Sequence, residues 1–172
     1  MKCHRKLIVG VVGCALLVLF CTTVHAASAQ ADDALSSDIS KAYAPLLAAY
    51  SKEFMGNPSA DCIAFAVKND MVSADLKTLL LKESAYKKKT RGVGHLDFDM
   101  FFNAQDDNEV PLRIVNITPE GGSYVMKVHN GFKGTKPYGF VLVQESGRWV
   151  IDDARYENGG KTVTLKNILK KP

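Results

Sequence analysis

Cysteine is scarce in this chain once its first residues are set aside. Three of the four cysteines lie in the first 26 residues, at Cys3, Cys14 and Cys21. Only Cys62 follows, and a single thiol cannot form an internal disulfide. Its apolar neighbours, 63–65, predict a buried small side chain, with pairing to another chain as the alternative. A catalytic nucleophile is disfavoured, because a reactive thiolate needs an electropositive, partly exposed setting.

A charge surplus is also missing. Three of the 22 Lys and Arg residues lie in the first 26 positions, so the rest of the chain is nearly neutral against 18 Asp and Glu. Nucleic-acid binding needs a basic surplus gathered on one face. The dense basic clusters, 87–91 and 170–171, are typical of solvated ends of helices. The chain has neither a Gly-rich phosphate loop nor a nucleophile elbow, and the sequence predicts no nucleic-acid partner and no cofactor.

The chain begins with the pattern of an export signal. Basic residues at 2, 5 and 6 precede an apolar run from Leu7 to Phe20, and Val24 and Ala26 supply small side chains for a signal peptidase. The sequence therefore predicts a signal peptide at 1–26 and a periplasmic protein.

Two alternatives to cleavage stay open. The apolar run approaches the length of a membrane-spanning helix, so an uncleaved signal anchor is one of them. A lipoprotein acylated at Cys21 is the other, although Phe20 stands where that signal needs a small residue.

The remaining 27–172 have the size of a single domain. Their first half predicts helices, because apolar residues recur every three or four positions, at Ile39, Tyr43, Leu46, Leu47, Tyr50 and Phe54. Pro45 lacks a backbone donor and is expected to bend or restart this helix. A short helix is predicted at 59–67. A third begins after a Ser73 cap and has an apolar face made of Leu76, Leu79, Leu80 and Tyr86.

The second half predicts a meander of strands at 112–118, 123–130, 138–145 and 148–154, separated by Gly-containing turns. In the last strand, alternation places Trp149 and Ile151 on the core side and Val150 on the other. A final segment near 165–169 is expected to cover the sheet edge or to form a short helix. Helices followed by an antiparallel sheet predict an α+β fold, with the N-terminal helices packed on a curved sheet.

One unusual segment, 92–107, lies between the halves and combines acids, amides and aromatics. Its string LDFDMFFNAQDD, together with the later GRWVIDDARY, resembles the exported bacterial proteins grouped as domain of unknown function 3828. The resemblance covers about 37–169 and implies a cystatin-like or nuclear-transport-factor-like cone. It implies no activity, because that of the family is unknown.

This segment holds the candidate ligand- or partner-binding residues, which are His95, Asp97, Asp99, Asn103, Gln105 and Asp106. A purely structural interpretation is the first alternative: Asp97, Asn103 and Asp106 would accept backbone donors and hold the loop. A calcium site is the second, although the spacing lacks the Gly and the closing Glu of a calcium loop. Two histidines and one apolar cysteine without short spacing do not predict a zinc site, and no metal is expected.

These observations predict a non-enzymatic periplasmic domain that binds a protein partner or a small ligand in the concavity of its sheet. A narrower form is an immunity protein that blocks an antibacterial effector. The alternative is a small hydrolase or isomerase in which His95 or His129 works with Asp97 or Asp99 as an acid–base pair.

Overall fold

The computed structural model describes residues 12–57, 60–92, 94–105 and 110–171, with side chains from Gln30 onward. The chain forms two compact units, 1–35 and 36–172. The predicted signal peptide, 1–26, falls in the first unit, where 1–11 lie outside the described residues and 12–26 are described as helical backbone.

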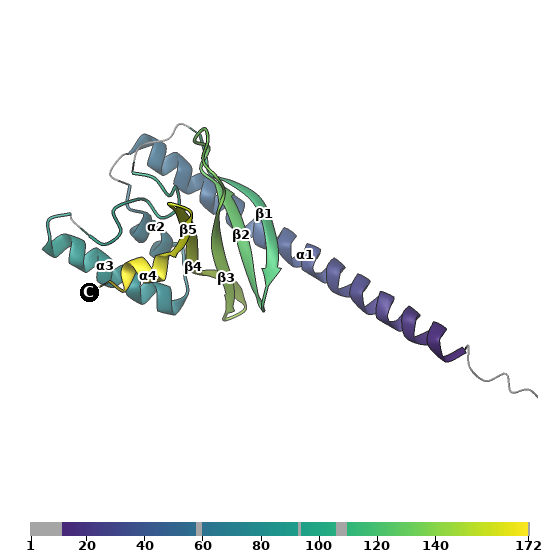
Figure 1. The fold of residues 1–172 in the computed structure, drawn as a ribbon. Coiled ribbons are helices and arrows are strands. Elements are labelled where there is room, and N and C mark those ends of the chain that lie inside the picture. Colours follow the sequence, from purple (N-terminus) through teal and green to yellow (C-terminus); the bar gives the residue numbers. More distant parts are fainter. Residues whose placement is uncertain (1–11, 58–59, 93, 106–109, 172) are drawn as a thin grey trace, which may run out of the picture. The chain divides into compact units, whose positions relative to one another are not determined.

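Helices precede a five-stranded antiparallel sheet, so the predicted α+β class is confirmed (Figure 1). The elements are α1 (Val12–Gly56), α2 (Cys62–Lys68), α3 (Ala74–Lys89), β1 (Arg113–Glu120), β2 (Ser123–His129), β3 (Tyr138–Glu145), β4 (Arg148–Asn158), β5 (Lys161–Thr164) and α4 (Leu165–Leu169). The strands pair in chain order, and α3 and α4 lie beside β4 and β5, away from the β1 edge.

The part of α1 within the second unit presents one buried stripe. Its members are Ile39, Tyr43, Leu47, Tyr50 and Phe54. Pro45 was expected to bend or restart the helix; the helix continues through Pro45, so it does not restart there. Pro45 and Lys41, whose carbonyl loses its helical donor, are both exposed. Water can satisfy that carbonyl, while the buried stripe holds the helix on its other side.

Local capping fixes the starts of the next two helices. Asp61 caps α2 and accepts bonds from the N–H groups of Ile63 and Ala64, so the helix begins later than predicted. Ser73 caps α3 as predicted.

The buried face of α3 differs from the prediction. Leu76 and Leu80 are buried and Leu79 is half-buried, but Tyr86 is 43% exposed. The third buried position is a carboxylate, Glu83, with 3% of its surface exposed. The prediction is right for Leu76 and Leu80, but it placed Tyr86 on the buried face and did not include Glu83.

A β-bulge shifts the phase of β4. Val141 faces Asp153 and Leu142 faces Ile151, so Asp152 is the extra residue. Because of the extra residue, the alternation of inward and outward side chains shifts by one position after Asp152, and Ile151 and Ala154 both face the core. The strand continues to Asn158, beyond the predicted end at 154. Trp149 packs against the core on the side of Ile151, as predicted.

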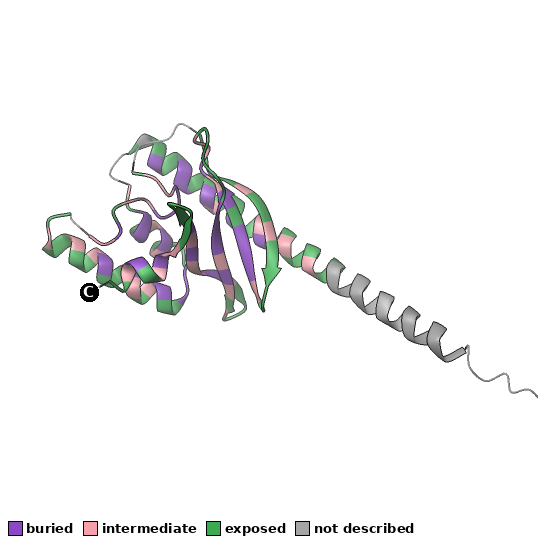
Figure 2. Ribbon diagram, in the orientation of Figure 1, coloured by how far each residue is buried: buried purple, intermediate pink, exposed green. Residues whose placement is uncertain are grey.

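The core lies between this sheet and the helices, where Figure 2 shows the buried faces turned towards one another. A short segment before α3 adds to the sheet. The N–H of Ile151 donates to the Met71 carbonyl at 2.8 Å, and the N–H of Ser73 donates to the Ile151 carbonyl at 2.8 Å. Val72 thus aligns parallel with Ile151. Among the helices in the described part of the chain, none is long and apolar enough to cross a membrane.

Candidate functional site

The connection between α3 and β1, described over 94–105, separates two open clefts. The first, the helix cleft, has a volume of about 990 Å³ and lies between the connection, the start of α2 and the end of α3. The second, the hairpin cleft, has a volume of about 690 Å³ and lies between the connection, the 130–135 loop and the β4–β5 hairpin. Both clefts share the lining residues Asp97, Phe98, Ala104 and Gln105.

Glu83 on α3 fixes the start of the connection. One carboxylate oxygen accepts the N–H of Leu96 at 2.9 Å, and the other lies 2.9 Å from Nδ1 of His95. The ring of His95 stacks on Tyr86 with centroids 4.5 Å apart. A Cβ on Gly94 would lie 2.2 Å from the Glu83 oxygen. Glycine is therefore required where the backbone passes this carboxylate.

The electrostatics of Glu83 follow from these partners. Burial alone would raise the pKa of its carboxyl, since it disfavours the charged form. The hydrogen bonds from the Leu96 N–H and from His95 outweigh burial and hold the pKa below its usual value. Glu83 is therefore an ionised buried carboxylate at neutral pH, and His95 is its partner.

Asp99 organises the middle of the connection. One oxygen accepts the N–H groups of Phe101 at 2.8 Å and Phe102 at 2.9 Å, and the other accepts the Tyr50 hydroxyl of α1. The backbone closes the same turn, because the Asp99 N–H donates to the Ala104 carbonyl at 2.9 Å. One side chain thus caps a turn and attaches it to α1.

Burial changes the pKa of Asp99 more than its hydrogen-bond donors do. Shielding from water raises the pKa of Asp99, although Tyr50, two backbone N–H groups and the Cys62 thiol donate to the carboxyl and oppose that rise. Burial and the neighbouring Asp99 also raise the pKa of the Cys62 thiol. Cys62 is buried, as predicted, and the raised pKa makes it a poor nucleophile.

The candidate residues therefore divide into two groups. His95 and Asp99 are engaged in bonds that hold the connection, and Asp99 also lines the helix cleft. The side chains of Asp97, Asn103 and Gln105 line the clefts, and within the described residues no hydrogen bond or ion pair engages them. Within the described part of the connection, Glu83 and Asp99 accept the backbone N–H groups that were expected to bond to Asp97 and Asn103. Asp106 lies outside the described residues.

The structure does not pair either histidine with Asp97 or Asp99, as the acid–base alternative requires. His95 pairs with Glu83 rather than with Asp97 or Asp99. His129 has both ring nitrogens on backbone groups, with Nε2 3.1 Å from the Thr135 carbonyl and Nδ1 2.8 Å from the Gly131 N–H. Neither histidine is a lining residue of the two clefts.

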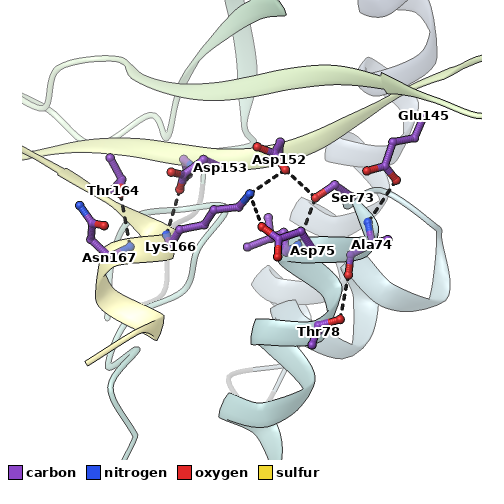
Figure 3. Close-up of polar contacts among 12 residues, drawn as sticks. Ser73, Ala74, Asp75, Thr78, Glu145, Asp152, Asp153, Thr164, Lys166 and Asn167 are labelled. Carbon is purple, nitrogen blue, oxygen red and sulfur yellow. Dashed lines mark hydrogen bonds and ion pairs between the residues drawn. The ribbon is translucent and has the colours of Figure 1, made fainter. Parts of the chain in front are cut away.

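A second polar cluster, around Lys166 of α4, was not predicted. Figure 3 shows its ammonium between Asp75 at the start of α3 and Asp152 in the β4 bulge, each at 2.7 Å. Asp152 also accepts the Ser73 hydroxyl at 2.8 Å. Burial alone would lower the pKa of Lys166, but its bonds to Asp152 and Asp75 outweigh burial and raise that pKa; the bond to Lys166 also lowers the pKa of Asp75. A lysine held in its charged form cannot act as a general base at neutral pH, so the cluster is a clamp between elements.

The described residues contain no group of three His, Cys, Asp or Glu side chains arranged to hold a metal ion. Comparisons of the chain with protein-family models, with curated proteins and with solved structures return no match.

Proposed function

We propose that this protein is an exported, non-enzymatic binding domain whose binding site is formed by the two clefts beside the 94–105 connection. The observation that carries the proposal is the division of the candidate residues. Two of them hold the connection by hydrogen bonds, while the side chains of Asp97, Asn103 and Gln105 line the clefts and have no hydrogen-bond partner among the residues that the structure describes. Polar side chains that line a cleft beside aromatic residues are typical of ligand sites.

The clefts replace the concavity of the sheet as the proposed location. The face of the sheet towards the helices is filled by core side chains such as Met126, Phe140 and Ile151, all fully buried. A ligand there would have to displace close-packed core.

The binding interpretation is better supported than the hydrolase or isomerase alternative. An acid–base pair must reach a substrate in a cleft, but His95 and His129 do not line either cleft. The immunity protein is the narrower form of the proposal, and it requires a gene for an antibacterial effector beside the gene for this protein. The proposed periplasmic location follows from the signal pattern, and the proposed membership of the family of domain of unknown function 3828 follows from the LDFDMFFNAQDD string.

Site-specific photo-crosslinking in living cells tests the proposal. A photoreactive residue replaces Gln105 on the shared wall of the clefts or, as the control, Asn116, which is exposed on β1 at the opposite edge. We expect adducts to a partner or ligand from position 105 and none from position 116, by mass spectrometry. Equal labelling at both positions, or none at 105, contradicts the proposal.

A further inference from the structure

The hairpin cleft combines amide side chains from separate segments. Asn103 and Gln105 come from the connection and Asn158 from the end of β4, and no hydrogen bond within the described residues engages their amide groups. Each amide can donate and accept at the same time. This is the pairing that a hydroxyl group needs, since it also donates and accepts.

Aromatic residues supply the apolar part of the same cleft. Phe98 is half-buried and meets Tyr156 edge-on, with ring centroids 5.1 Å apart. The Tyr156 hydroxyl donates to the Met100 carbonyl at 2.9 Å, so this ring is fixed. Asn130 fixes the opposite wall, because its side-chain oxygen accepts the Phe132 N–H at 3.2 Å and the Thr135 hydroxyl at 2.8 Å.

The charges of the cleft balance. Asp97 and Lys133 are opposite in sign, and Glu157 is paired at 3.0 Å with Lys136 outside the lining. A cleft without a charge surplus gives no strong preference for an anion or a cation. Its selectivity must come from neutral hydrogen bonding and from contact with the aromatic rings.

We propose that the hairpin cleft binds a neutral saccharide. Hydroxyl groups surround a sugar ring in several directions, which suits amides that come from separate segments of the lining, and the C–H groups on the faces of the sugar ring suit contact with the aromatic rings of Phe98 and Phe132. An extended peptide is the competing ligand. It binds most simply by adding to the backbone of one strand edge, whereas the polar groups of this cleft are side chains from several elements. The inference rests on the proposed binding function and names its ligand class.

Saturation-transfer NMR and calorimetry on the full-length protein test this inference. The probes are triacetylchitotriose, maltotriose and, for the competing class, trialanine. We expect at least one saccharide to bind and trialanine not to bind. Gln105→Ala and Asn158→Ala should each weaken binding about tenfold, through loss of one hydrogen-bonding group. Asn116→Ala on β1 is the matched control, and Ser84→Ala, which alters only the helix cleft, is the second.

Three outcomes overturn the saccharide assignment. Binding of neither saccharide is the first, and binding of trialanine alone is the second. The third is saccharide binding that Ser84→Ala weakens and Asn158→Ala leaves unchanged, which moves the site to the other cleft. Crosslinking from position 105 in cells that accompanies any of these outcomes keeps the proposed binding function and rejects only the ligand class.

Discussion

The carboxylates at the connection and the carboxylates around Lys166 use different kinds of hydrogen-bond donor. Glu83 and Asp99 accept backbone N–H groups of the connection itself. Asp75 and Asp152 share the ammonium of one lysine. A backbone donor is fixed to the path of the chain, so such a bond decides where the chain runs. A lysine side chain is flexible and can follow its partners, so it ties together elements that already exist.

The largest effect is expected from removing the Asp99 acceptor. Asp99→Ala leaves two backbone N–H groups and the Tyr50 hydroxyl without this partner, at about 1 to 3 kcal/mol for each group that stays buried. We expect a loss of roughly 3 kcal/mol or more in urea unfolding. Asp99→Asn keeps an acceptor and should lose much less. Equal losses for the two variants would show that the negative charge, rather than the acceptor, holds the turn.

Crowding at Gly94 should give the next largest effect. Gly94→Ala places a methyl group against the Glu83 oxygen and the Lys87 side chain, and we expect a cost of about 1 to 3 kcal/mol. Combined with Glu83→Ala, the same change should cost clearly less, because the oxygen it meets is gone. Strict additivity in this double-mutant cycle would contradict the approach to the Glu83 oxygen as the cause and leave the Lys87 side chain as the source of the crowding.

The ion pairs of Lys166 should contribute less to the free energy of unfolding than the contacts of Asp99 and Gly94 at the connection. Lys166→Met removes both ion pairs but leaves Asp152 with the Ser73 hydroxyl, and we expect a loss of about 1 kcal/mol. Added salt should shrink this difference by screening, while the Asp99→Ala loss stays constant. Lys41→Met, which removes an exposed pair, is the control and should have almost no effect. If the loss for Lys166→Met did not change with salt, the two ion pairs would not be its source.

The smallest effect is a pair of opposite pH dependences. The pKa of Glu83 is lowered by folding, so its contribution to stability is present above the unfolded value of about 4.3 and is lost as the pH falls through the folded value. The pKa of Asp99 is raised, so protonation favours the folded state as the pH falls through that value. Glu83→Gln should therefore flatten the acid loss of stability, and Asp99→Asn should steepen it. Unfolding curves from pH 7 to pH 3 measure both, and the same sign for the two variants would refute one of the assignments.

The parts of the fold that depend on neighbours in sequence could be predicted. The Ser73 cap is an example, since its acceptor and donor lie three residues apart. The choice of Asp99 over Asp97 as the turn-capping acid could not be predicted, because Asp99 is selected in part by Tyr50, 49 residues away. The same holds for Glu83, whose burial depends on the path of the connection past Gly94. The bulge at Asp152 exists only in the pairing with β3, so alternation within β4 predicted Trp149 and Ile151 but not Ala154.

The short parallel pairing of Val72 with Ile151 has a consequence for the order of folding. The sheet is built from successive hairpins and needs only local contacts, whereas the segment before α3 must find a strand about 80 positions later in the chain. Contacts of such separation form slowly and late. During synthesis α1 and α3 leave the ribosome before β4 exists, so their packing against that strand has to wait. The pairing of Val72 with Ile151, and the packing that depends on it, can therefore be completed only after β4 has been made.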